Sequence, residues 1–211
     1  MAFDLYIFDL DGTLIDTRRD LTTAVNEMLA LYGIGPKSVA EVTGCVGDGI
    51  KKLVERSFGD TSFDVEEALP VFKKCYWNHM LDTTAPYPGI MNLLSRLKGS
   101  YKAILTNKAY RFTRAITDGL CLTPYFPIIV GGDSVERKKP STDGVEYILE
   151  RAGLPKARAV MIGDGKNDIV VAKKAGLTVV WVTYGFSDRS RLLGEIPDYT
   201  IDTPEQLLDI G

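Results

Sequence analysis

The sequence contains no long run of lysine and arginine and only three cysteines, and both shortages exclude classes of protein. Its 25 Lys and Arg residues are outnumbered by 28 Asp and Glu residues, which gives a net charge of −3 at pH 7. A negative chain without a basic run is not typical of a nucleic-acid-binding protein. Cys45, Cys75 and Cys121 are far apart and form no CxxC pair. This favours reduced thiols over a disulfide or a metal site.

Long apolar runs are also missing. No window of about 18 apolar residues occurs, so we expect no transmembrane helix and no membrane partner. The first residues do not form the basic and apolar segments of a secretory signal, because Asp4, Asp9 and Asp11 interrupt them. Together these absences favour a cytoplasmic protein.

Short apolar runs, in contrast, recur through most of the chain. The run at 3–9 is nearly continuous, as expected for a strand that is buried on both faces of a parallel sheet. Further runs alternate with segments of helical periodicity. The runs lie at 101–106, 127–132, 159–164, 178–183 and 199–202, and the helical segments at 89–98, 109–119, 141–152 and 167–175. This alternation predicts an α/β fold with a doubly wound, parallel, Rossmann-like sheet.

The segment from about 17 to 84 interrupts this alternation. It has helical patterns at 20–32, 49–58 and 64–81 and no convincing strand. We expect Asp20 to cap the first of these helices and Pro70 to kink or split the third. The sequence therefore predicts an α/β core of residues 1–15 and 85–211 with an all-helical insertion at 16–84.

Polar residues follow four of the predicted strands. Asp9 and Asp11 come after the first strand, and the stretches LTNK (105–108), ERKKP (136–140) and IGDGKND (162–168) follow the next three. In open α/β sheets, ligands bind beyond the carboxyl ends of the strands. We therefore expect these groups to line one cleft, although Asp-x-Asp-Gly taken alone could be only a turn.

In this order, the four motifs resemble those of the haloacid dehalogenase superfamily: DxDGT, a Thr, Lys-Pro and GDxxxD. The resemblance covers the whole chain, and the helical insertion resembles the family's cap domain. The stretches FDLDGTLIDT, CVGDGI and VGGDSVERKKP resemble the phosphoglycolate phosphatase-type branch. The resemblance implies a phosphatase that hydrolyses a small phosphorylated metabolite, with 2-phosphoglycolate as the leading substrate.

The chemistry expected of such a site assigns roles to the acids. Asp9 is the candidate nucleophile, because an aspartyl-phosphate divides a difficult hydrolysis into two easier steps. Mg²⁺ held by Asp9, the backbone carbonyl of Asp11 and Asp164 would offset the negative charge. The Asp11 side chain is the expected general acid and base. True dehalogenases of the family usually lack an acid at this second position and need no metal, so Asp11 favours a phosphatase.

Phosphate binding is expected from the next two motifs. The Thr106 hydroxyl and the backbone N–H of Asn107 would donate to phosphate oxygens. Lys139 would supply the positive charge that phosphoryl transfer requires, and Pro140 directly after it favours Lys139 over Lys138. Asp168 is the expected partner that orients Lys139.

The remaining candidates are supporting residues. Gly12 would let the backbone turn sharply beside the phosphate, and Thr13 would hydrogen-bond near the nucleophile. In the insertion, Gly47, Asp48 and Gly49 precede a predicted helix, whose first N–H groups suit an anionic end of the substrate. Asp48 argues for helix capping instead, with Lys51 and Arg19 as candidates to offset its charge, and the stretch could simply be a turn.

Several alternatives stay open at this point. A broad sugar or nucleotide phosphatase, a pyrophosphatase and a phosphomutase would all use the same site. A catalytically inactive binding protein and a haloacid dehalogenase belong to other classes. The chain is expected to be a monomer or a homodimer.

Overall fold

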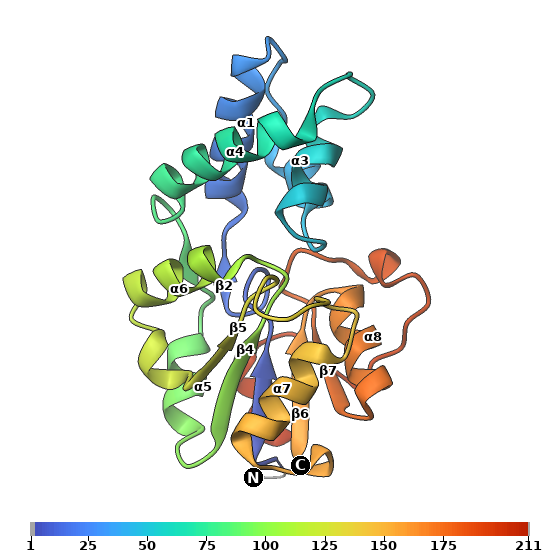
Figure 1. Cartoon of the computed structure of the whole chain (residues 1–211). Helices are drawn as coiled ribbons and strands as arrows, with labels where there is room; N and C mark the ends of the chain where they lie inside the picture. Colours follow the sequence, from blue (N-terminus) through green and yellow to red (C-terminus); the bar gives the residue numbers. More distant parts are fainter. Residues whose placement is uncertain (1–2, 211) are drawn as a thin grey trace. The chain divides into compact units, whose positions relative to one another are not determined.

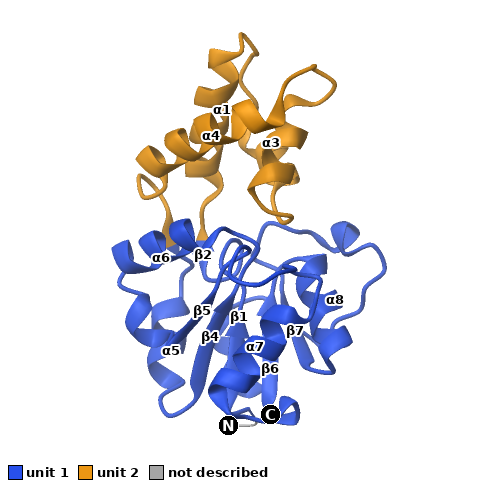
Figure 2. Cartoon of the chain, viewed as in Figure 1, with its two compact units in different colours: residues 1–15, 86–211 blue, residues 16–85 orange. Residues whose placement is uncertain are grey.

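The computed structural model describes residues 3–210 and divides into two compact units (Figure 2). Unit 1 comprises residues 1–15 and 86–211, and unit 2 comprises residues 16–85. Strands β2 (Ile15–Asp16) and β3 (Ala85–Pro86) pair with each other and contain the two points at which the chain passes between the units.

Unit 1 is built on a six-stranded sheet in the order β5-β4-β1-β6-β7-β8, and every strand pair is parallel (Figure 1). Leu5 of the central strand pairs with Tyr101 on one side and Ala159 on the other. The six predicted strands are confirmed, as is the doubly wound α/β fold. The strands are β1 (Leu5–Phe8), β4 (Tyr101–Leu105), β5 (Ile128–Val130), β6 (Ala159–Gly163), β7 (Thr178–Val182) and β8 (Tyr199–Ile201).

Both faces of this sheet are buried. Leu5 and Ile7 of β1 belong to the hydrophobic core shared with α7 and α8, which contact each other. The alternate residues, Tyr6 and Phe8, point to the opposite face and are buried as well. This explains why the strand has no polar alternation. The helices of unit 1 are α5 (Ile90–Arg96), α6 (Tyr110–Gly119), α7 (Asp143–Ala152) and α8 (Lys166–Ala175), with short 3₁₀ turns η1 (Thr123–Tyr125), η2 (Lys156–Arg158), η3 (Arg189–Leu192) and η4 (Pro204–Asp209).

Unit 2 is helical apart from the strand residues at its two ends. Its helices are α1 (Arg18–Leu31), α2 (Val39–Cys45), α3 (Ile50–Phe58) and α4 (Val65–His79). Helix α4 runs through Pro70 without being split. The sequence prediction missed α2, although Ser38 and Glu41 form a capping box, a signal that is readable as S-x-x-E.

Asp20 corrects one prediction. Helix α1 begins at Arg18 with Thr17 as its N-cap residue, so Asp20 does not cap it. Instead, the Asp20 carboxylate accepts hydrogen bonds of 2.6–3.0 Å from the N–H and hydroxyl groups of Thr83 and Thr84. This contact ties α1 to the segment that leads into β3.

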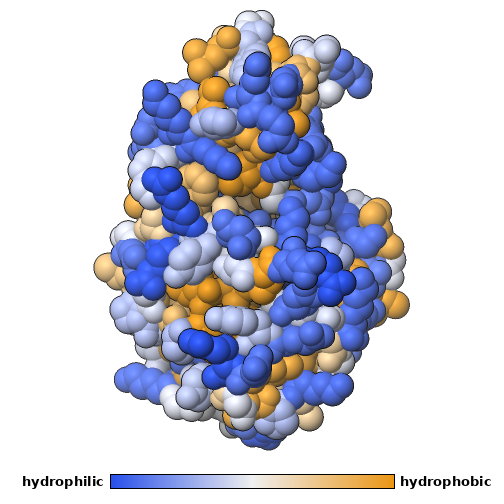
Figure 3. Space-filling view, in the orientation of Figure 1, coloured by the Kyte–Doolittle hydropathy of each residue, from blue (hydrophilic) through white to orange (hydrophobic). Residues whose placement is uncertain are grey.

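The surface shows no large uniform patch on the face drawn in Figure 3, where hydrophobic side chains lie in small groups among hydrophilic ones. Within residues 3–210, no helix has the length and apolar character that crossing a membrane requires.

Candidate active site

Three predicted site residues follow three neighbouring strands. Asp9 comes directly after β1, Thr106 after β4 and Asp164 after β6. β4 and β6 are the two neighbours of β1, so the three residues lie at the same edge of the sheet. After β1 the chain forms β4 and β5 on one side of this strand, and it then crosses to form β6 on the other side. Such a topological switch point is where open α/β sheets bind ligands.

Lys139 forms a buried ion pair with two acids at this edge. Its Nζ lies 2.9 Å from Oδ1 of Asp9 and 2.6 Å from Oδ1 of Asp168. The second oxygen of Asp168 accepts the Gly165 N–H at 3.0 Å. Oδ1 of Asp9 also accepts the Leu10 N–H at 2.8 Å. The sequence predicted the contact between Lys139 and Asp168, whereas the catalytic role of Lys139 stays a prediction.

Asp164 is held mainly by backbone groups. Its Oδ2 accepts the N–H of Phe186 at 2.6 Å and of Ser187 at 3.2 Å. Its backbone carbonyl accepts the indole N–H of Trp181 at 2.8 Å. The sequence analysis missed these contacts because the loop after β7 carries no chemical motif. The glycine of this loop, Gly185, was the one available signal.

Two glycines make room for the Asp164 carboxylate. A Cβ atom on Gly12 would lie 2.5 Å from Oδ2 of Asp164, and Gly12 has a φ of +82°. A Cβ atom on Gly185 would overlap Asp164 and the carbonyl of Gly12. Close approach and a positive φ therefore both require glycine at position 12.

The crowding of acids changes their pKa values. Burial raises the pKa of Asp9, Lys139 opposes this shift and Asp168 adds to it, so the pKa is about 6. Burial raises the pKa of Asp164 to about 8, with Asp168 and Asp9 adding to the shift and the two N–H groups opposing it. Burial lowers the pKa of Lys139, but Asp168 and Asp9 outweigh this effect and raise it. Burial and the neighbouring acids together favour the protonated forms of Asp9 and Asp164.

The donor set fits a divalent cation. Oxygen atoms of Asp9, Asp164 and Asp168 lie within 4.8 Å of one another. The two oxygens of Asp168 already contact Lys139 and Gly165, so Asp9 and Asp164 are the better candidates for side-chain ligands. When ionised, these three acids and Asp11 carry two more charges than Lys108 and Lys139 offset, and hard carboxylate oxygens suit Mg²⁺. The carbonyl of Asp11 as a further ligand stays a prediction.

Asp11 has a partner that the sequence analysis did not assign. Lys108 Nζ lies 3.0 Å from Oδ1 and 2.8 Å from Oδ2 of Asp11. Their side chains are only 5% and 12% exposed, respectively. No sequence pattern links two residues 97 positions apart, although a lysine directly after Thr-Asn at a strand end was visible.

The phosphate-binding candidates lie beside these groups. Thr106 is buried, and its Oγ1 accepts the Lys108 N–H at 3.2 Å. The side-chain amide of Asn107 donates to the carbonyl of Lys139 at 3.1 Å. The hydrogen bond expected from the Thr13 hydroxyl is not formed with any described residue. Thr13 contributes through its carbonyl instead, which accepts the Tyr184 hydroxyl at 3.2 Å.

The three candidates of the insertion lie in unit 2. Gly47 and Gly49 have positive φ values of 120° and 86°. Asp48 pairs with Arg56 of α3, whereas Lys51 pairs with Glu66. That Lys51 offsets the charge of Asp48 stays a prediction. Gly49 is the N-cap residue of α3, so Asp48 stands one position before the cap. Their part in substrate choice stays a prediction.

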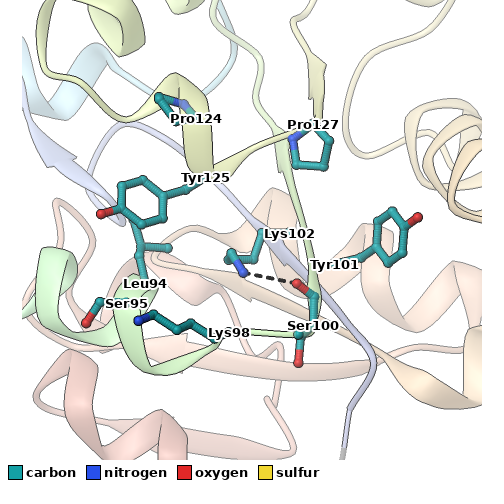
Figure 4. A pocket seen from close by; sticks show the side chains of 10 residues that line it. Leu94, Ser95, Lys98, Ser100, Tyr101, Lys102, Pro124, Tyr125 and Pro127 are labelled. Carbon is teal, nitrogen blue, oxygen red and sulfur yellow. Dashed lines mark hydrogen bonds between the residues drawn. The ribbon is translucent and has the colours of Figure 1, made fainter.

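A hollow lies at the opposite end of the sheet, at the start of β4 and before β5. Figure 4 shows Lys98, Tyr101, Lys102 and Tyr125 among its lining side chains. Lys102 Nζ donates to the carbonyls of Leu97 and Ser100 at 2.8 and 3.0 Å. This hollow is separate from the carboxylates that follow β1 and β6.

Comparison with known families supports a hydrolase. Residues 6–182 match the model of a family described as haloacid dehalogenase-like hydrolase. Phosphoglycolate phosphatase 1 of Pseudomonas aeruginosa is 36% identical over 214 residues, covering 97% of this chain and 78% of that protein. The phosphoglycolate phosphatase of Aquifex aeolicus is 35% identical over 206 residues, covering 97% and 94%.

A solved structure is similar over the whole chain. It is the crystal structure of a predicted phosphoglycolate phosphatase from Haemophilus somnus. The TM-score is 0.91 at 27% sequence identity, and the match covers 100% of this chain and 98% of that one. The parallel sheet with an inserted helical unit is thus shared with that protein.

Proposed function

The chain belongs to the haloacid dehalogenase-like hydrolase family, and on that basis we propose that it hydrolyses 2-phosphoglycolate to glycolate and phosphate with Mg²⁺. The assignment as a phosphoric monoester hydrolase rests on the family and on the relatives named phosphoglycolate phosphatase. The observation that carries the chemistry is the carboxylate of Asp9, fixed by Lys139 at the end of β1 and surrounded by further acids.

Asp9 is suited to nucleophilic attack. Leu10 and Lys139 hold its Oδ1, and no hydrogen bond from a described residue reaches its Oδ2. In the proposed reaction, Oδ2 attacks phosphorus while the bond from phosphorus to the glycolate oxygen breaks. Water then attacks the aspartyl-phosphate and releases phosphate. Lys139 lowers the cost of bringing two negative groups together.

Asp9, the Asp11 carbonyl and Asp164 would hold the cation. When bound, Mg²⁺ would orient the phosphoryl oxygens and offset the two excess negative charges of the site. Burial, and after it the neighbouring acids, raise the pKa values of Asp9 and Asp164 to about 6 and 8. A bound cation would offset both effects, and this supports the proposal. Thr106 and Asn107 would donate to the phosphate.

Asp11 is the proposed acid and base. Its carboxyl group would donate a proton to the leaving oxygen and later accept one from the attacking water. The cytoplasmic location and the choice between monomer and homodimer stay predictions.

The test is phosphate release from a panel of substrates. The panel contains 2-phosphoglycolate, a sugar phosphate, a nucleoside monophosphate and pyrophosphate, each with Mg²⁺ and with EDTA. Asp9→Asn serves as the blank and the exposed Asp209→Asn as the matched control. A strong preference for 2-phosphoglycolate supports the proposal. Faster release from another substrate would agree with the proposed reaction but would refute 2-phosphoglycolate as the preferred substrate.

A further inference from the structure

Lys108 is fixed so that it reaches Asp11. It lies three residues beyond the end of β4, and its N–H donates to the Thr106 hydroxyl at 3.2 Å. Its carbonyl accepts the Gly132 N–H at 2.8 Å. The backbone is thus held on two sides, and the side chain spans to the loop after β1, where its ammonium contacts both oxygens of Asp11.

This ion pair limits the freedom of the Asp11 carboxyl group. An acid or base must present one carboxyl oxygen to the leaving oxygen of the substrate, but the ammonium of Lys108 engages both oxygens. Opening the pair takes the negative charge of Asp11 away from a buried ammonium, which is unfavourable. A negatively charged group of the substrate that replaced Asp11 on Lys108 would offset this cost.

The substrate of the proposed reaction carries such a charge. In 2-phosphoglycolate the carboxylate is separated from the leaving oxygen by a single CH₂ carbon. Asp11 must contact that oxygen, and Lys108 Nζ lies within 3.0 Å of both Asp11 oxygens. A carboxylate at this position therefore comes within reach of the Lys108 ammonium.

We propose that Lys108 is a specificity-determining residue that binds the carboxylate of the substrate and, by exchanging partners, releases Asp11 toward the leaving oxygen. The proposal rests on the proposed function and deepens it. The substrate class is phosphate monoesters whose ester carbon carries a carboxylate. The other buried ammonium of the site does not suit this exchange, because Lys139 is committed to Asp9 and Asp168.

The exchange of Asp11 for the substrate carboxylate on Lys108 gives a physical basis for discrimination between substrates with and without a carboxylate. A neutral group in place of the carboxylate leaves Lys108 on Asp11, so the acid stays occupied. A site built around a polar group of the substrate rejects an analogue that lacks it much more strongly than an apolar pocket does. Selectivity for the carboxylate would then come from the core unit itself.

The experiment compares matched substrate pairs on matched variants. 2-Phosphoglycolate is paired with 2-hydroxyethyl phosphate, and 2-phosphoglycerate with glycerol 2-phosphate. In each pair a CH₂OH group replaces the carboxylate. The variants are Lys108→Met, Lys108→Arg and the control Lys102→Met, which removes another buried lysine near the opposite end of the same strand. The readout is kcat/KM at saturating Mg²⁺, with circular dichroism to verify the fold.

Lys108→Met is expected to lower kcat/KM for the carboxylate substrates by about 100-fold and for the neutral partners by less than about tenfold. Lys108→Arg should restore most of the preference, and Lys102→Met should keep it. An equal loss on both members of each pair would overturn the proposal, because Lys108 would then only position Asp11. Equal wild-type rates on both members would also overturn it.

Failure of the proposed function gives a different result. If the wild-type enzyme hydrolyses other monoesters but not 2-phosphoglycolate, the substrate named in the proposed function is refuted. The 2-phosphoglycerate pair then decides the role of Lys108. If neither pair is turned over, calorimetric binding of 2-phosphoglycolate to Asp9→Asn and to Asp9→Asn/Lys108→Met decides it. Equal affinity of the two variants contradicts the role.

Discussion

Asp164 in unit 1 and Asp20 in unit 2 are both buried carboxylates, 5% and 1% exposed, but their pKa values shift in opposite directions. Burial raises the pKa of Asp20, but hydrogen bonds from Thr83 and Thr84 outweigh burial and lower it. Asp164 has two backbone donors and other acids as neighbours, and its pKa is about 8. A buried carboxylate whose pKa is lowered by hydrogen bonds from its own fold has a structural role. A buried carboxylate whose pKa stays raised among other acids indicates a site for a ligand.

The largest expected effect is that of Asp9→Asn. The amide cannot form the aspartyl-phosphate, so we expect no phosphate release above the rate without enzyme, with the fold intact. The measurement is phosphate release from 2-phosphoglycolate, together with a thermal unfolding curve. Turnover near the wild-type rate would remove Asp9 as the nucleophile.

Asp164→Asn should lower activity and remove the response of the protein to Mg²⁺. We expect kcat to fall by about 10²–10³-fold, as for loss of one preorganised electrostatic group, and Mg²⁺ to stop stabilising the protein. Mg²⁺-dependent activity is measured in parallel with Asp209→Asn as the control. A variant that keeps its full Mg²⁺ response would contradict the ligand assignment.

The same variant makes a pH prediction. The pKa of Asp164 is about 8 in the folded protein against an ordinary value of 3.8. The folded state therefore keeps a proton that the unfolded chain loses, and the unfolding free energy of the metal-free protein falls as pH rises between these values. Urea unfolding in EDTA at pH 5 and pH 8 should show a smaller decline for Asp164→Asn. An unchanged decline would assign the effect to other groups.

Asp20→Asn should have the converse effect. We expect a loss of about 2–3 kcal/mol in unfolding free energy, because the amide accepts fewer of the hydrogen bonds and brings its own donors, while kcat changes little. The lowered pKa of Asp20 contributes stability above pH 3.8, which is lost as pH falls through the folded value. Urea unfolding between pH 3 and pH 7 tests this. Unchanged stability would show that the hydrogen bonds to Asp20 are dispensable.

The smallest effect is expected from Thr84→Val, which removes one hydroxyl donor of 2.7 Å to Asp20. Loss of one hydrogen bond to a charged group should cost about 1.5–3 kcal/mol, at most as much as Asp20→Asn. A double-mutant cycle with Asp20→Asn measures the coupling. Strictly additive effects would contradict a direct interaction between the two side chains.

The sequence alone predicts the strands of unit 1 because their apolar runs are nearly continuous. It also predicts the positions of Asp9, Thr106 and Asp164 beyond the carboxyl ends of strands, because strand ends follow from the same pattern. Contacts between distant segments could not be predicted in this way. Asp20 looks like a helix cap by local preference, but its partners lie 63 and 64 residues away. Lys108 and the N–H groups of Phe186 and Ser187 join the site only through tertiary folding.

The most direct test of the account is to trap the phosphorylated enzyme. Wild-type protein is mixed with a small excess of 2-phosphoglycolate and Mg²⁺, quenched in acid within milliseconds and digested for mass spectrometry, with Asp9→Asn treated in parallel. The account predicts a transient phosphoryl group on the Asp9 side chain of the wild-type protein and none on the variant. Rapid turnover without phosphorylation of Asp9, or phosphorylation of another residue, would contradict it.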